Sequence, residues 1–522
     1  MPAPRQSDSA PPRTSTSEAT LTTPTTTDEA TTAPARGVVI DEAVPQRLTR
    51  EQFTIIALLL GSAFVVILNE TTMSVALAPL MADLGITAST GQWLTTAFML
   101  TMSVIIPATG FLLQRLGTRG AYLLAMSLFS AGTLLAALSP GFGWLLGGRI
   151  VQASGTAIMM PLLMTTIMTV VPPAIRGKIM GNISIVMAAA PALGPAISGV
   201  ILDALSWRWV FGIVLPIALF ALVMGFLYVR DVADRTHSRL DPLSLGLAAV
   251  AFGGLVYGLS SIGEAARETP PVSPAIPLVA GAVVLALFAW RQLRLARDGR
   301  ALLDLGVFRS RGFSVGLSIL AVGMLAMFGS LILLPLFLQD AMGLPPLATG
   351  LVVLPGGLLM GLLGPTVGRL YDRVGPRPLV TPGLVVVTIA LALFTRVHAD
   401  TSPWYVLALH VTLSLGLAFM FTPLFTSALS SLSPKLYSHG SAAIGTLQQL
   451  AGAAGTAMFV AVMTTRSVAL LADGASPQVA LAEGVGDAFL WGTAIMLVAV
   501  GLSFLLRRVP TTPEGEGAPA AH

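Results

Sequence analysis

The chain has 522 residues, of which 54% are apolar and only 10% are charged, with a formal net charge of +4 and no cysteine. Ordinary soluble domains carry roughly 25% charged residues, so this composition indicates a protein whose solvent is lipid. The absence of cysteine excludes disulfides, thiol chemistry and cysteine-ligated metals. A small positive charge on a membrane protein reflects basic loops, so we expect no nucleic-acid partner. No metal site is expected either.

Residues 1–50 differ from the rest of the chain, because they are rich in Thr, Ala and Pro and contain no long apolar run. Such a segment buries too little apolar surface to offset the cost of ordering, so we predict a disordered N-terminal tail. It also lacks the apolar core of a signal peptide, so the first spanning helix must direct membrane insertion. Residues 509–522 form a second predicted tail.

Between the tails, apolar runs of about 20 residues recur, the length that spans the hydrocarbon core of a bilayer. They are continuous rather than alternating, which excludes the strands of a membrane barrel. We therefore predict an all-α polytopic membrane protein. The fourteen expected transmembrane helices lie at residues 53–78, 91–112, 119–138, 143–166, 179–201, 208–229, 243–261, 275–293, 313–338, 347–369, 379–397, 404–430, 440–464 and 486–506.

The first expected helix carries the ionisable residue Glu70 well inside its ends. An ionisable residue within a membrane span is costly and is a functional candidate by default. Burial favours the neutral form of a carboxyl group, so Glu70 is the candidate proton carrier. Its neighbours Asn69 and Met73 are candidate cavity residues, although Asn69 also suits helix packing and Met is a common filler of apolar cores.

A basic, glycine-containing turn is written twice, as "GFLLQRLGTR" at 110–119 and "GRLYDRVGPR" at 368–377. Both copies place Gly first and eighth, and Arg sixth and tenth. The helices expected to begin near 53 and 313 are separated by nearly the same offset. We therefore predict two six-helix bundles in parallel repeat, as in transporters that rock around a central site. The predicted domains are 51–229, 313–508 and, between them, two inserted helices with linkers over 230–312.

The helix expected at 143–166 supplies a cation, Arg149, at a membrane depth similar to that of Glu70. We predict that the two form a couple in which Arg149 biases Glu70 towards ionisation, since Arg stays charged. A static ion pair that only fixes packing is the structural alternative. Gln152 and Thr156 share a helix face with Arg149, so they either line a cavity or satisfy the guanidinium.

Two later spans carry further candidates. In "APALGPAISG" at 190–199, Pro195 removes a helix hydrogen bond, and Gly194 and Gly199 are expected to let a neighbouring helix approach closely. Gln448, in the span at 440–464, suits cavity lining and interhelical bonding equally well. A lone intramembrane histidine, His410, is interpreted as a packing residue.

No sequence of the phosphate-loop type occurs, since the only Gly-Lys pair, Gly177-Lys178, is followed by Ile179. No nucleophile, paired carboxylate or metal-ligand spacing points to catalysis either. We therefore expect a transporter rather than an enzyme, with no cofactor, no use of ATP, and protons as the coupling ion.

The loop charges predict the orientation in the membrane, because Lys and Arg gather on the cytoplasmic side. An even number of spans places both termini on one side, and most loop Lys and Arg lie on that side, which makes both termini cytoplasmic. The opposite loops are expected to hold only Arg208, Arg267, Arg396 and Arg466.

Together these motifs, with "ILNETTMSVAL" at 67–77, "RIVQASGTA" at 149–157 and "WRWVF" at 207–211, resemble the major facilitator superfamily. The match is to its fourteen-helix drug:proton antiporter branch. The resemblance implies a multi-pass protein of the bacterial plasma (inner) membrane that exports amphiphilic small molecules, such as drugs or antibiotics, by alternating access. The span at 179–201 is implied to carry the antiporter motif, here with Ala190 and Ser198 where Gly is frequent.

In that family the loop carboxylate caps a neighbouring helix and latches the outward-facing state. Here Asp372 keeps the carboxylate in the second copy, whereas Gln114 replaces it in the first, which implies a weaker first latch. The residues implied to act in these conformational loops are Gly110, Gln114, Arg115, Gly117, Arg119, Gly368, Asp372, Arg373, Gly375 and Arg377.

Two alternatives to drug efflux stay open at this point. One is a dedicated proton-coupled exporter of a single endogenous metabolite, siderophore or lipid. The other is a membrane receptor or scaffold that does not transport. The expected partners are an amphiphilic small molecule, protons and the lipid bilayer, for a chain that acts as a monomer or in an oligomer that the sequence leaves open.

Overall fold

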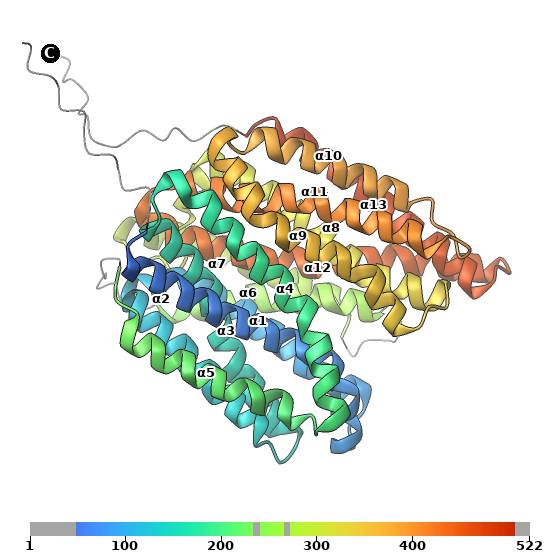
Figure 1. Cartoon of the computed structure of the whole chain (residues 1–522), viewed down its shortest axis with the longest axis horizontal. Coiled ribbons are helices and arrows are strands. Elements are labelled where there is room, and N and C mark those ends of the chain that lie inside the picture. The colour runs from blue at the N-terminus through green and yellow to red at the C-terminus, as the bar shows by residue number, and fades with distance from the viewer. Residues whose placement is uncertain (1–47, 233–240, 266–271, 507–522) are drawn as a thin grey trace, which may run out of the picture. The chain divides into compact units, whose positions relative to one another are not determined.

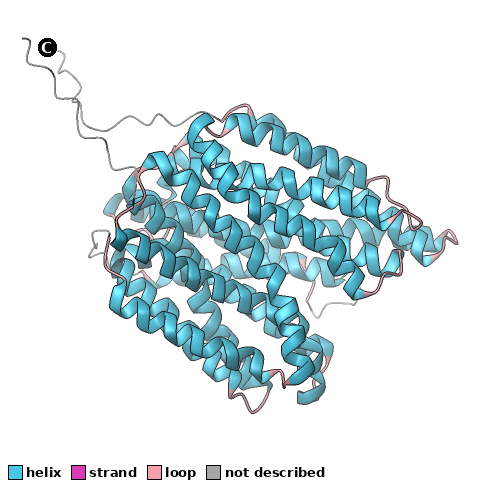
Figure 2. Ribbon diagram, viewed as in Figure 1, coloured by secondary structure: helices cyan, strands magenta, loops and turns pink. Residues whose placement is uncertain are grey.

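The computed structural model describes residues 48–232, 241–265 and 272–506, which form thirteen α-helices joined mostly by short loops (Figure 1). Every regular element within these ranges is helical, and no strand occurs among them (Figure 2). The predicted all-α class is confirmed. The predicted tails, residues 1–50 and 509–522, lie outside the described residues except for residues 48–50.

The helices follow one another in three groups. The N-terminal helices are α1 (Arg50–Leu84), α2 (Ala88–Ala137), α3 (Phe142–Val170), α4 (Arg176–Ala204) and α5 (Arg208–Tyr228). The inserted helices are α6 (Pro242–Ala265) and α7 (Ala275–Leu295). The C-terminal helices are α8 (Arg311–Leu336), α9 (Pro346–Val374), α10 (Arg377–Phe394), α11 (Pro403–Ser430), α12 (Tyr437–Ala472) and α13 (Pro477–Ser503).

Twelve segments of the described residues are long and apolar enough to cross a membrane. One of them, the 45-residue segment Trp93–Ala137, is interrupted at Gly117, whose φ of 73° and ψ of 178° are not helical. The 29-residue helix α4 is also of spanning length at about 1.5 Å per residue. The chain is a multi-pass helical membrane protein, as predicted, while the count of fourteen spans stays a prediction.

Several helix ends differ from the prediction. α1 continues past residue 78 to Leu84, and α13 begins at Pro477 rather than near 486. The apolar run starts later than the helix because Ser476 caps the helix and the first turns carry polar residues. α12 continues past residue 464 to Ala472, so Arg466, expected in a loop, lies in this helix. Arg466 pairs with Asp487 of α13 at 3.2 Å. Arg267 lies outside the described residues.

The repeated motif builds the same turn twice. Gly117 and Gly375 both have positive φ, 73° and 82°, which glycine adopts without strain. In each copy the Arg at the tenth position stacks on a Phe near the end of the sixth predicted span of its own repeat. Arg119 lies 5.2 Å from the ring centre of Phe226, and Arg377 lies 5.5 Å from that of Phe504.

The N-terminal and C-terminal helices meet along two seams. α4 packs against α9, as Figure 1 shows, and α2 packs against α12. α6 packs against both α2 and α12, with Trp93 of α2 stacked on Tyr257 at 6.2 Å between ring centres, and α7 packs against α6. The inserted helices therefore cover the α2–α12 seam. The boundaries of the three predicted domains stay predictions.

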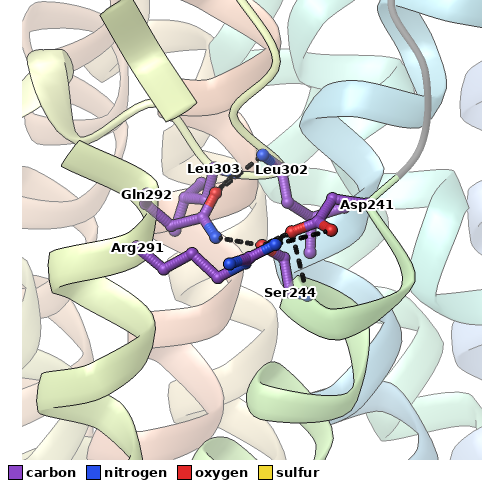
Figure 3. Close-up of polar contacts among 6 residues, drawn as sticks. All are labelled: Asp241, Ser244, Arg291, Gln292, Leu302 and Leu303. Atoms are coloured by element: carbon purple, nitrogen blue, oxygen red, sulfur yellow. Dashed lines mark hydrogen bonds and ion pairs between the residues drawn. The ribbon is translucent and has the colours of Figure 1, made fainter. Parts of the chain in front are cut away.

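A polar cluster fixes the ends of α6 and α7 beside the linker to α8 (Figure 3). Arg291 donates two hydrogen bonds to Asp241, at 2.7 and 2.9 Å, and these bonds hold the pKa of the Asp241 carboxyl well below its usual range. The buried amide of Gln292 donates to Ser244 Oγ at 2.8 Å and accepts from the backbone N–H of Leu302 at 2.7 Å. The cluster therefore joins two helices and the linker at one point.

Candidate transport cavity

A cavity of about 430 Å³ lies between the N-terminal and C-terminal helices and is lined by residues of α1, α2, α3, α4, α8, α9, α11 and α12. No described residue of the inserted helices lines it. Its wall is dominated by flexible thioethers, from Met99, Met102, Met159, Met160, Met164, Met180, Met187, Met324, Met327 and Met360. Such side chains adapt to varied apolar ligands.

Among the described residues that line this cavity, Glu70 is the only carboxylate. It makes no hydrogen bond within the described part of the chain, so its carboxyl group is free to bind a proton or a ligand. Arg149 acts on it electrostatically. The two candidate coupling residues therefore lie close enough to interact electrostatically.

Arg149 does not form the static ion pair that was the structural alternative, because no salt bridge within 4.0 Å joins it to Glu70 in the described residues. Its side chain is 1% exposed and donates to Gln152 Oε1 at 2.7 Å. The guanidinium also lies 4.0 Å from the ring centre of Phe98, and its Nε is buried without a partner. The guanidinium is therefore contacted by an amide one turn away on its own helix and by an aromatic face.

The other predicted cavity residues divide into two groups. Thr156 and Gln448 line the cavity, which is one of the two roles left open for each. Gln152 does not, because it lies between Arg149 and Thr133, to which it donates at 2.8 Å. Met73 packs in an apolar cluster with Trp207, and Asn69 is 1% exposed with both amide atoms unpartnered. Asn69 and Met73 lie outside the wall of the cavity.

The motif of α4 packs against α1 next to Glu70. A Cβ at Gly194 would overlap Thr71 Oγ1, and Ser198 Oγ donates to the Thr72 carbonyl at 3.0 Å. Gly199 has no neighbour within 4 Å of an added Cβ, so the expectation of a close approach there is wrong. Pro195 is within α4, but its side chain lies outside the described residues.

Sequence reasoning missed much of the C-terminal wall, which includes Met324, Met327, Met360 and His410. Met324 and Met327 are three residues apart on α8, a spacing that places them on one helix face. That spacing was a usable signal. The inward direction of the face was not, since α8 is apolar on every side.

The helices meet at one end, which we call the basic face and define by Gly117, Arg176, Asp372 and Lys435. The carboxylate of Asp372, at the end of α9, accepts hydrogen bonds from the backbone N–H groups of Gly177 and Lys178, at 2.8 and 2.9 Å. These groups belong to the first turn of α4, where the helix dipole favours a negative charge.

The other copy of the motif makes a different contact on this face. Gln114 donates from Nε2 to the Lys435 carbonyl at 3.0 Å, just before α12, and so does not cap a helix N–H. Arg176 of α4 donates to the hydroxyl of Tyr437 in α12 at 3.4 Å. Both contacts join N-terminal to C-terminal segments.

The remaining loop residues serve these contacts. A Cβ at Gly368 would overlap the Gly177 carbonyl, and one at Gly110 would meet the ring of His439, so both glycines permit helices to approach closely. Arg115 and Arg373 flank the turns.

Two hydroxyl pairs lie between this closure and the cavity. Ser184 and Thr422 are 2.7 Å apart between α4 and α11, and Thr165 donates to Ser441 at 3.2 Å between α3 and α12. Ser184 and Thr422 also line the cavity. The described conformation is therefore closed below the cavity on the basic face.

Residues 59–456 match the family model described as Major Facilitator Superfamily. The chain belongs to this superfamily. A relative, the lincomycin resistance protein LmrB of Listeria monocytogenes, is 40% identical over 459 residues, covering 87% of this chain and 96% of that protein. The protein of the same name from Bacillus subtilis is 38% identical over 457 residues, covering 86% and 95%.

Among solved structures, the human organic anion transporter MFSD10 (TETRAN) is similar with a TM-score of 0.60 and 17% identity, covering 87% of this chain and 99% of that one. At this identity the likeness shows the major facilitator fold alone. The superfamily and fold predicted from the repeated turn are confirmed.

Proposed function

We propose that this major facilitator protein is a drug exporter that moves amphiphilic small molecules out of the cell in exchange for protons. The names of its two relatives, which align with it over nearly their whole length, support antibiotic efflux. The absence of a phosphate-loop sequence supports an ion gradient as the energy source.

The observation that carries the proposal is a single carboxylate, Glu70, in a methionine-rich cavity. A carboxyl group without a protein partner binds either a proton or the cationic group of a substrate. Binding of one displaces the other, and this competition is the basis of exchange. Each proton that crosses 100 mV supplies about 2.3 kcal/mol, enough for a roughly fiftyfold substrate gradient.

Arg149 has the role of biasing this carboxylate. The guanidinium lies on α3 and the carboxyl on α1, so a movement between these two helices that changes their separation changes the proton affinity of Glu70. In the closed conformation Arg149 bonds to Gln152 and makes no salt bridge to Glu70 within 4.0 Å among the described residues. The proposal requires the separation to differ when the basic face opens.

We further propose that the basic face is cytoplasmic and that the chain resides in the plasma (inner) membrane of a bacterium, with both termini in the cytoplasm. The loop arginines and lysines at this face, among them Arg115, Arg119 and Lys178, support that orientation. The described conformation is then closed on the cytoplasmic side.

The test is proton-driven efflux in proteoliposomes with Glu70→Gln. Gln keeps the volume and bonds to water but carries no proton, so we expect loss of pH-driven transport with normal folding. Glu51→Gln is the matched control, because Glu51 lies at the start of the same helix and pairs only with Arg230 at the surface. Full proton-driven efflux by Glu70→Gln removes this residue from the mechanism.

The same assay separates the alternatives. A dedicated exporter moves one compound in a chemically varied panel, whereas a drug exporter moves several. A receptor or scaffold moves none and is insensitive to the Glu70 change.

A further inference from the structure

The C-terminal wall of the cavity is mainly apolar and carries no carboxylate, lysine or arginine among its described residues. Its hydrogen-bonding side chains are Ser330 of α8, His410, Ser414 and Thr422 of α11, and Gln448 and Gln449 of α12. The N-terminal wall presents Glu70 instead. The cavity therefore has one acidic side and one side of amide, hydroxyl and imidazole groups.

The two amides on α12 are free. Neither Gln448 nor Gln449 makes a hydrogen bond to any described residue, although both line the cavity. Each amide offers two N–H donors and one carbonyl acceptor. Consecutive residues on a helix point about 100° apart, so the pair presents a broad polar strip rather than a single point.

Two further polar atoms in this wall are buried without partners, Ser330 Oγ and His410 Nδ1. The imidazole packs against Gly356, where an added Cβ would overlap the edge of the ring. Both atoms are covered by protein in this conformation, so the hydrogen-bonding capacity that the wall offers to a ligand lies in the two amides.

We propose that this wall, with Gln448 and Gln449 as its main contacts, selects substrates that carry several neutral hydrogen-bonding groups. Such a substrate is an amphiphile with a basic amine that faces Glu70 and with hydroxyl or amide groups at its other end. This proposal rests on the proposed export function and adds to it the chemical class of the substrate. The amides act on recognition of the substrate and not on the proton.

The experiment uses two probes in proteoliposomes that hold the full chain. Lincomycin carries a basic amine, hydroxyl groups and an amide, whereas tetraphenylphosphonium is a permanent cation without hydrogen-bonding groups. The variant is Gln448→Met together with Gln449→Met, which keeps side-chain length and matches the thioethers around it. Gln478→Met, at the exposed start of α13, is the control.

We expect the double variant to lose lincomycin efflux by about tenfold or more in kcat/KM, the effect of two lost hydrogen bonds, with tetraphenylphosphonium efflux unchanged. An equal loss for both probes, or no loss for either, overturns the selective wall. Efflux of tetraphenylphosphonium alone by the unmodified chain overturns it as well. Failure of the unmodified chain to move either probe overturns the proposed export function itself.

Discussion

Asp372 accepts a hydrogen bond of 2.8 Å from the backbone N–H of Gly177, and this contact joins the end of α9 to the first turn of α4. The two residues lie far apart in the sequence and on opposite sides of the seam between N-terminal and C-terminal helices. The equivalent position in the other copy, Gln114, donates to a carbonyl instead. The closure at the basic face therefore depends unequally on the two copies.

Asp372→Asn is expected to open the basic face. Asn lacks the charge that two N–H groups and the α4 dipole stabilise. The lost stabilisation of the closed conformation is about 1–2 kcal/mol, which shifts the equilibrium between closed and open conformations by about five- to thirtyfold. Because the chain has no cysteine, Ser184→Cys introduces a single reporter for a membrane-impermeant thiol reagent. Ser184 lies between the closure on the basic face and the cavity. Labelling of Ser184→Cys from the basic side should rise.

Asp340→Asn is the control for this prediction, since Asp340 is an exposed carboxylate at the other end of the molecule. Met99→Cys, on the cavity wall, reports from the opposite side. Unchanged labelling at both reporters in Asp372→Asn would show that the carboxylate does not set the conformational balance.

Arg149→Lys is expected to slow proton-driven efflux substantially, and Arg149→Ala to slow it further. Lys keeps the charge but loses the planar group that bonds Gln152 while stacking on Phe98. Efflux in proteoliposomes measures the effect. Arg396→Lys, in an exposed loop, is the control for replacing an Arg by a Lys. Rates equal to those of the unmodified chain in Arg149→Lys would mean that the position needs only a positive charge.

The sequence predicted Glu70 and Arg149 because charged residues are rare in apolar spans, and it predicted the fold because the turn at 110–119 recurs at 368–377. It offered Gln152 as one possible partner of Arg149 but did not predict the contact with Phe98. Gln152 lies on the same helix and was visible as a neighbour, but Phe98 comes from another helix. Contacts between helices depend on rotation about each helix axis, which an evenly apolar sequence leaves undetermined.

Asp241→Asn is expected to destabilise the attachment of the inserted helices. Arg291 then keeps only a neutral partner at this buried site, at a cost of about 1–3 kcal/mol. Thermal unfolding of the purified protein at pH 7 measures the loss, with Asp400→Asn in an exposed loop as the control.

The pH dependence of this effect has a definite sign. The pKa of Asp241 is lowered in the folded state, chiefly by the hydrogen bonds from Arg291. The ionised carboxylate therefore contributes fully to the free energy of unfolding above the unfolded pKa of about 3.9. It is lost as the pH falls further towards the folded pKa. The stability difference between Asp241→Asn and the unmodified chain should therefore narrow only below about pH 4; a difference already gone at pH 6 would assign the effect to another group.

Gly194→Ala and Gly199→Ala form a matched pair within α4. Each replaces glycine by alanine inside the same helix, a change that by itself favours the helix by up to about 1 kcal/mol. The added Cβ at position 194 overlaps Thr71 Oγ1 on α1, one residue after Glu70, whereas at position 199 it meets nothing within 4 Å.

We therefore expect Gly194→Ala to push α4 away from α1 at the level of Glu70 and to lower proton-driven efflux several-fold, while Gly199→Ala leaves efflux unchanged or improves thermal stability. A pH-jump efflux assay with equal amounts of folded protein compares the two. Equal loss in both variants would mean that the motif acts through glycine flexibility along α4. Equal retention would mean that Thr71 rotates aside, and that close packing of α4 on α1 is not needed for coupling.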